Sequence, residues 1–284
     1  MTNDIIIDPT TDKNIQVFRK SPFPCLALIG PAGSGKTFLA AYICDQILDP
    51  TTNKSGASVI NIDAKISGID EVRDLQKSLK LTTYGTQDIR RAVIISNFDY
   101  FGHEAQNSLL KTLEEPPLDT IIVITVNNES KVLQTIYSRV KKIVVRPVSK
   151  AQATDVFLDK YSDTEINKAF SLSMGQTGLL TSLLEDKGAH DLVRAIELAK
   201  NVLKLPKANQ LAEIDKITKS KDIAVDVFLD GLLRIFNVSY ALAVNKEIDV
   251  KVAHARLVAI NECIADVELG LNKKLSLTRL FLKI

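Results

Sequence analysis

An eight-residue segment near the N-terminus has the residue types and spacing of a phosphate-binding loop. It matches the pattern G-x-x-x-x-G-K-[ST] and comprises Gly30, Pro31, Ala32, Gly33, Ser34, Gly35, Lys36 and Thr37. Glycines let backbone N–H groups close around a phosphate, and the N-terminus of a following helix adds partial positive charge. Lys36 is predicted to reach the outer phosphates, and the Thr37 hydroxyl to contact a magnesium ion. The segment therefore predicts a site for ATP or ADP with Mg²⁺, and leaves open whether the nucleotide is hydrolysed.

The elements that such a loop needs are present on both sides of it. Residues 25–29 are apolar and predict a buried strand, and residues 38–43 predict a helix. Further nearly continuous apolar runs rich in β-branched residues are typical of parallel strands buried on both faces. These runs are 59–62, 92–96 and 121–126, and residues 143–145 would form a last strand. The strands alternate with helical stretches at 69–79, 102–115 and 133–137. The alternation predicts a doubly wound α/β sheet that binds its ligand at the carboxyl ends of the strands.

After Pro147 the sequence becomes helical, with no convincing strand. Apolar residues recur at helical spacing, as in amphipathic helices that pack on one another. The expected helices are 151–161, 164–171, 178–185, 222–244, 249–269 and 275–282, with breaks at Gly188 and around Pro206. We therefore expect an α/β domain at 1–147, a small helical domain at 148–187 and an all-helical C-terminal domain at 188–284.

Composition narrows the class of protein only slightly. The 36 basic and 34 acidic residues nearly balance, so net charge neither demands nor excludes a nucleic-acid partner. The three cysteines are scattered and form no disulfide framework, which favours a reducing, cytoplasmic location. Residues 1–4 lack the basic head of a signal peptide, and no apolar run approaches the length of a membrane span. No membrane partner is expected.

A second segment can be interpreted as an amphipathic helix that ends at two prolines, but its residues are more specific than such a helix needs. Residues 107–117, NSLLKTLEEPP, resemble the NALLKTLEEPP signature of bacterial clamp-loader subunits, the AAA+ proteins of the DNA polymerase III holoenzyme. Residues 138–140, Ser-Arg-Val, stand where that family has Ser-Arg-Cys, and 68–73 and 270–282 resemble its Ile-Asp-x-x-Arg and closing helices. The resemblance implies an AAA+ P-loop parallel-sheet domain, a small helical lid and an all-α C-terminal oligomerisation domain.

Within that family, two positions resemble the delta-prime subunit, which usually does not hydrolyse ATP. The acidic Asp-Glu pair of the motor subunits falls on Ser96 and Asn97, and neither can act as a general base. The lid arginine of the motors is replaced by Gly178. The alternative is a hydrolysing gamma/tau-like motor in which Asp99 replaces the missing pair, although strand alternation predicts that Asp99 points differently from position 97. An unrelated P-loop kinase or NTPase fits the helical C-terminal half less well.

The resemblance also assigns roles to single residues. Arg139 is expected to be the catalytic residue, an arginine finger that projects into a neighbouring subunit's nucleotide site. Asn127 falls at the sensor position beside the nucleotide, although a loop start after a strand explains it equally well. Only Cys44 stands where many relatives have four cysteines, so no zinc and no metal other than nucleotide-bound Mg²⁺ is expected.

The implied partners follow from the same resemblance. They are the other clamp-loader subunits of a hetero-pentamer, the sliding clamp through that complex, and primer-template DNA contacted at its backbone. The chain is then a component of a DNA-directed DNA polymerase holoenzyme, and it is not expected to be an active ATPase alone.

Overall fold

The computed structural model describes residues 6–48, 58–80, 89–185, 190–220 and 222–284. Contacts divide the chain into two compact units, Met1–Ser149 with Gln176–Gly178 and Lys150–Gly175 with Leu179–Ile284. The predicted break at Gly188 and the N-terminal residues 1–4 lie outside the described residues. The division into three domains stays a prediction.

The described part of the first unit contains a five-stranded sheet in the order β2-β3-β4-β1-β5, in which every pairing is parallel. The strands are β1 (Cys25–Ile29), β2 (Ser58–Asp63), β3 (Arg91–Ser96), β4 (Thr120–Val126) and β5 (Lys141–Val144). All five predicted strands fall on these elements, with the last displaced by one to two residues. The predicted α/β fold with a doubly wound parallel sheet is confirmed.

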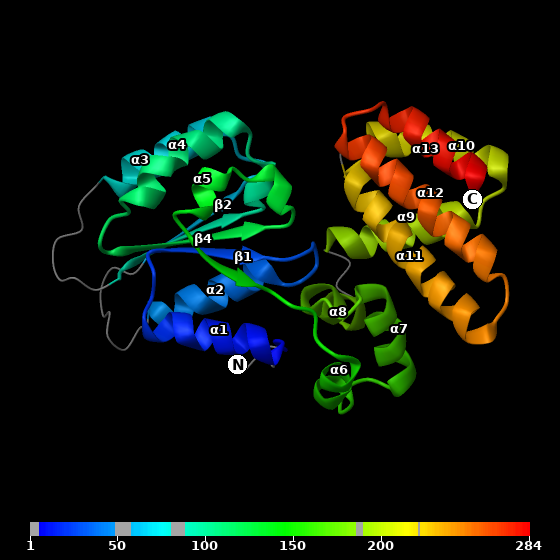
Figure 1. The fold of residues 1–284 in the computed structure, drawn as a ribbon, viewed down its shortest axis with the longest axis horizontal. Coiled ribbons are helices and arrows are strands. Elements are labelled where there is room, and N and C mark those ends of the chain that lie inside the picture. Colours follow the sequence, from blue (N-terminus) through cyan, green and yellow to red (C-terminus); the bar gives the residue numbers. More distant parts are fainter. Residues whose placement is uncertain (1–5, 49–57, 81–88, 186–189, 221) are drawn as a thin grey trace. The chain divides into compact units, whose positions relative to one another are not determined.

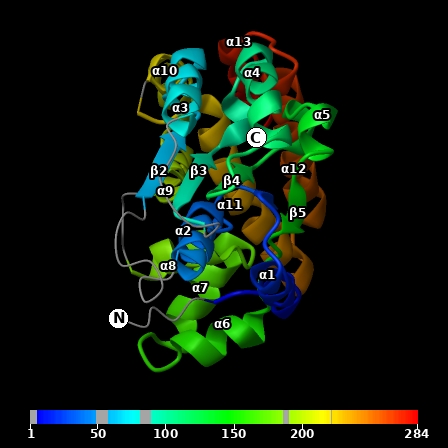
Figure 2. The same cartoon turned by 90° about the vertical axis from the view of Figure 1, so that its left-hand side faces the viewer.

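Helices cover both faces of this sheet (Figures 1 and 2). One face carries α3 (Ile69–Leu79), α4 (His103–Glu114) and α5 (Gln134–Tyr137), and the other carries α1 (Pro9–Lys20) and α2 (Lys36–Ile47). Alternate residues of β3 enter the two cores, Val93 and Ile95 on one side and Ala92 and Ile94 on the other. This double burial explains the uninterrupted apolar run.

The prediction of burial on both faces is wrong for β2. Among the strands that the structure describes, β2 lies at the edge of the sheet and pairs with β3 alone. Its Val59 side chain is 49% exposed. A β-branched run therefore identified the strand but not its place in the sheet, because an edge position depends on the order of strands in the whole sheet.

The second unit contains helices and no strand in its described part, as predicted, and the first two residues of α8 are grouped with the first unit. Two of its helices, α9 and α10, were not predicted individually. The hydrophobic core of α9 to α13 includes Phe228 and Phe281, whose rings stack with centroids 6.5 Å apart. The helices are α6 (Lys150–Phe157), α7 (Asp163–Ser173), α8 (Thr177–Leu184), α9 (Asp191–Leu203), α10 (Lys207–Lys219), α11 (Val225–Lys246), α12 (Val250–Glu268) and α13 (Lys273–Lys283).

Helix α11 is the one helix among the described residues with the length and apolar composition of a membrane span, contrary to the sequence expectation. Core helices of soluble proteins meet the same criteria. α11 packs on α9 and α12, and it carries an ion pair between the buried Arg234 and Asp230. The buried residues of α11 all lie between Val225 and Phe236, so its N-terminal half packs as a core helix does.

Candidate functional site

The phosphate-binding loop connects the interior strand β1 to α2 at the carboxyl edge of the sheet. Gly30 continues β1 by donating its N–H to the Val126 carbonyl at 3.1 Å. Gly33 and Gly35 have φ angles of 87° and 82°, in the left-handed region that glycine adopts without steric cost. α2 begins at Lys36 directly after Gly35, so its first N–H groups face the loop. The predicted strand–loop–helix arrangement is present.

Lys36 lies inside this loop, with 5% of its surface exposed. Its Nζ donates to the Gly30 carbonyl at 2.7 Å, the Pro31 carbonyl at 2.8 Å and Ser34 Oγ at 3.1 Å. Burial lowers the pKa of Lys36 to about 8, and the negative charge of Asp99 partly opposes this shift. Thr37 is exposed in the first turn of α2. The loop therefore holds a cation that an incoming phosphate could take over from the loop's own oxygens.

Gly178, at the start of α8, packs directly on the loop. A Cβ built on Gly178 would lie 2.8 Å from the Gly35 nitrogen and 2.9 Å from the Gly33 carbonyl oxygen. The adjacent Thr177 donates its hydroxyl to the Ser34 carbonyl at 3.1 Å. Position 178, where the resemblance led us to expect an arginine in motor subunits, has no room for a side chain.

Two asparagines meet at the carboxyl ends of neighbouring strands. Asn127 Nδ2, after β4, donates to Asn97 Oδ1, after β3, at 3.0 Å. Asn97 Nδ2 in turn donates to Asp63 Oδ1 at the end of β2, at 2.9 Å. The sequence singled out positions 97 and 127 but missed Asp63. Its place at the end of a strand was the available signal, because carboxyl ends of parallel strands share one edge.

Asp99 belongs to the same network, which corrects the expectation from strand alternation. Asp99 is 5% exposed, and its Oδ1 accepts from Asn127 N at 2.9 Å and Asn127 Nδ2 at 3.3 Å. Its Oδ2 accepts from Asn128 N at 3.3 Å. β3 ends at Ser96 and Asn97 turns the chain with a φ of 55°, so the alternation of a strand no longer applies. Asn97 and Asp99 converge on one Asn127 amide.

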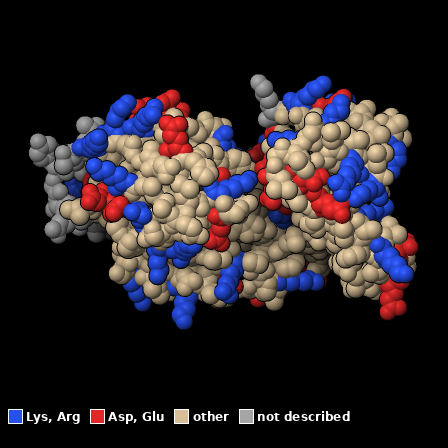
Figure 3. Space-filling view, turned by 45° about the horizontal axis from the view of Figure 1, so that its top comes forward, with Lys and Arg blue, Asp and Glu red and all other residues tan. Residues whose placement is uncertain are grey.

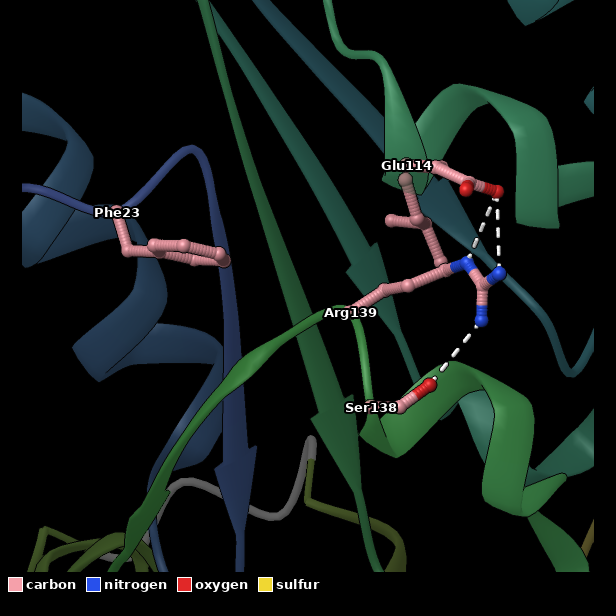
Figure 4. Close-up of a pocket in the computed structure, with 5 residues that line it drawn as sticks. Phe23, Glu114, Ser138 and Arg139 are labelled. Carbon is pink, nitrogen blue, oxygen red and sulfur yellow. Dashed lines mark hydrogen bonds and ion pairs between the residues drawn. The ribbon is translucent and has the colours of Figure 1, made fainter.

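Arg139 follows the short helix α5, on the surface of the first unit (Figure 4). Its neighbours Ile136 and Val140 are buried in the core and fix the backbone on both sides. The guanidinium Nε and one terminal nitrogen lie 3.2 Å and 3.1 Å from Glu114 Oε2. A surface pocket of about 360 Å³ is lined by Arg139 and Glu114, together with Phe23, Leu113 and Ser138.

Gln106 directly precedes the signature of residues 107–117 in α4, and sequence reasoning did not single it out. This side chain is fully buried, and its Nε2 donates to the carbonyls of Phe101 at 2.8 Å and Lys131 at 2.9 Å. Its Oε1 accepts from Leu133 N at 2.9 Å. Gln106 thereby ties α4 to the segment between β4 and α5 that leads to Arg139. A buried amide with all these partners was not predictable from spacing.

The remaining candidate features are spread over the molecule. All three cysteines are buried and unbridged, and no three His, Cys, Asp or Glu side chains gather as a metal site within the described residues. Basic and acidic side chains are interspersed on the face seen in Figure 3. This face therefore offers no uniformly basic surface for nucleic acid.

Sequence comparison with known proteins finds similarity to subunits of DNA polymerase III. The family model described as "DNA polymerase III, delta subunit" matches residues 43–149. The tau subunit of DNA polymerase III from Bacillus subtilis is 30% identical over 63% of this chain and 34% of its own length. The delta-prime subunit from Haemophilus influenzae is 27% identical over 44% of this chain and 38% of its own length. The chain thus spans little more than a third of these two relatives.

The fold has a counterpart among solved structures. A DNA polymerase III gamma subunit-related protein from Thermotoga maritima superposes with a TM-score of 0.59 at 20% identity, covering 96% of this chain and 97% of the other. This likeness extends over the α/β unit and the helical part alike. Family model, sequence relatives and fold agree with the motifs at residues 30–37, 107–117 and 138–140, and they support the resemblance of this chain to the clamp-loader AAA+ proteins of DNA polymerase III.

Proposed function

We propose that this chain is a delta-prime-like subunit of a sliding-clamp loader in DNA replication, one that binds nucleotide with little or no hydrolysis. In this proposal Arg139 is an arginine finger that completes the nucleotide site of a neighbouring ATPase subunit. The observation that carries the proposal is the Asn97–Asn127 hydrogen bond of 3.0 Å, an uncharged pair where a hydrolysing relative is expected to hold an acid.

The proposal extends to organisation and partners. The AAA+ domain would comprise 1–147, the lid 148–187 and a helical collar 188–284, through which the chain joins other clamp-loader subunits. The complex would act on the sliding clamp and contact the backbone of primer-template DNA, in the cytoplasm. The family relationship supports these partners.

Nucleotide binding is supported by the fit of the loop. Gly30–Thr37 would hold the phosphates, with Lys36 supplying a buried positive charge and the start of α2 supplying N–H groups. Bound nucleotide would bring its phosphates and Mg²⁺ to this edge of the sheet. The chain's own residues limit what happens next, because an asparagine amide cannot accept a proton from an attacking water.

Asp99 is also poorly placed to act as the general base for hydrolysis. Both its carboxylate oxygens are already engaged with N–H groups of Asn127 and Asn128. These bonds hold the carboxylate against the end of β4. A base for hydrolysis must direct a lone pair at the water, whereas these bonds turn the carboxylate towards the end of β4, which supports binding without turnover.

Arg139 is suited to act outside its own subunit. Its side chain is 28% exposed and stands on a short turn between buried residues. The guanidinium keeps its charge at any physiological pH and can fork across two phosphate oxygens. A finger supplied by a neighbour is worth about 10³–10⁵ in rate.

Reconstitution with the partner subunits tests this role. Arg139→Ala should slow ATP hydrolysis, by up to about 10³-fold at the one site that the finger completes. Arg139→Lys retains the charge but not the fork, and should give an intermediate rate. Assembly should be unchanged by size-exclusion chromatography. A fully active complex with Arg139→Ala would remove the finger role.

A hydrolysing motor remains the second candidate, favoured by the charge of Asp99 acting on Lys36. If Asp99 assists hydrolysis, the isolated chain should turn over ATP and Asp99→Asn should abolish it. The delta-prime-like proposal expects no turnover in either protein.

A further inference from the structure

Arg139 is restrained by its own subunit. Besides the two contacts with Glu114 Oε2 at 3.2 Å and 3.1 Å, its other terminal nitrogen donates to the Thr135 carbonyl at 2.9 Å and Ser138 Oγ at 3.1 Å. Figure 4 shows the guanidinium turned towards Glu114. The side chain does not project freely from the surface.

These contacts use most of what the guanidinium can offer. Arginine carries five N–H donors, arranged in a fork of fixed geometry. The edge formed by Nε and one terminal nitrogen faces Glu114, and both donors of the remaining nitrogen have partners in Thr135 and Ser138. An anion that binds by two parallel N–H groups therefore has to displace at least one of these partners. Glu114 is the partner that also neutralises the charge.

Both members of the pair are carried by well-anchored segments. Glu114 is the last residue of α4, next to the buried Leu113 and ahead of the two prolines that end the helix. Arg139 stands between the buried Ile136 and Val140. The carboxylate is 59% exposed, so it can move into water once its partner is taken. The ion pair is therefore held in place by its backbone segments, and another anion can still replace Glu114.

We propose that Glu114 is a counter-ion that holds Arg139 until a terminal phosphoryl group presented by a neighbouring subunit replaces it. This deepens the proposed function and rests on Arg139 acting across a subunit boundary. A terminal phosphoryl group carries more negative charge than one carboxylate and offers several acceptor oxygens to the fork. The exchange favours a triphosphate end over weaker anions, and it keeps the finger from binding carboxylates on other surfaces.

Chemical modification of the isolated chain tests the restraint without any partner. Phenylglyoxal reacts with accessible arginines, and peptide mass mapping gives the rate at Arg139 alone. Glu114→Gln should raise that rate about two- to fivefold, the range expected for losing an exposed ion pair. Glu115→Gln is the matched control, because the ion pair with Arg139 is made by Glu114 and not by the neighbouring Glu115, and it should leave the rate unchanged. Equal rates in the three proteins would overturn the restraint.

Reconstituted complexes test the exchange. Glu114→Gln should lower, by about two- to fivefold, the concentration of this subunit that gives half-maximal stimulation of ATP hydrolysis. Faster modification with an unchanged or higher half-maximal concentration would overturn the exchange, since Glu114 would then merely cover or orient the arginine. A complex that stays active with Arg139→Ala would instead contradict the proposed function, and the modification result would still decide the restraint.

Discussion

The backbone of Gly178 lies against that of Gly35, so close that a Cβ on Gly178 would come within 2.8 Å of the Gly35 nitrogen. Residues 176–178 are grouped with the α/β unit through this contact. Glycine at position 178 therefore allows residues 176–178 to pack on the phosphate-binding loop.

Substituting this glycine should be costly. The Cβ of Gly178→Ala would meet backbone atoms of Gly33 and Gly35 below 3.0 Å, so the loop or α8 must shift. We expect a loss of about 1–3 kcal/mol in the free energy of unfolding, measured by urea denaturation. Gly102→Ala is the control, because a Cβ there meets nothing within 4 Å and reports only the loss of a glycine at a helix N-cap. Equal losses in both variants would contradict the close approach.

Nucleotide affinity should depend on the ionisation of Lys36. Burial lowers the pKa of Lys36 to about 8, and bound phosphates would raise it again by favouring the charged form. Binding then takes up a proton above pH 8, so the Kd should be flat below about pH 7 and rise up to about tenfold per pH unit above pH 8. Titration calorimetry across this range measures the slope. Lys36→Ala should bind weakly at every pH, and unchanged binding would refute the loop assignment.

The cysteines should be unreactive in the folded chain. Burial raises the pKa of Cys25 and Cys44 to about 12 and that of Cys263 to about 11, and the thiolate is the reactive form. A disulfide reagent such as DTNB should label none of the three at pH 8 and all three in denaturant. Rapid labelling of any one in the native chain would show that its part of the core opens.

Arg234 should matter for the stability of the helical unit. It is 2% exposed, pairs with Asp230 at 3.0 Å, and donates to the carbonyls of Leu172 and Ser173 at the end of α7. Arg234→Met should cost about 1–3 kcal/mol, because buried acceptors lose their donor. Arg279→Met removes an exposed pair with Glu262 and should cost less than about 1 kcal/mol. Urea unfolding compares the two, and equal effects would mean that the buried contacts contribute nothing extra.

Much of the α/β fold was predictable because strands buried on both faces have a distinctive composition. The apolar runs of β1, β3 and β4 located their strands to within one residue. The exposed side of β2 was not predictable, because a strand's own sequence does not state how many neighbours it has. The helices α9 and α10 were covered only by the general expectation of a helical C-terminal half.

The candidate site was likewise predictable from the sequence only in part. The phosphate-binding loop follows a local pattern, and Asn97, Asn127 and Arg139 could be placed by counting along the chain. The Asp63–Asn97 bond, the turn of Asp99 towards Asn127 and the Glu114–Arg139 pair join residues far apart in sequence. Such pairings depend on strand order and on the positive φ of Asn97, which no single-sequence pattern specifies.

Steady-state ATP turnover by the purified, isolated chain tests the central claim most directly, alongside nucleotide binding measured on the same preparation. The account predicts saturable binding that requires Lys36, with no hydrolysis above background. Sustained hydrolysis that Lys36→Ala abolishes would contradict it, and would assign this chain to the motor subunits.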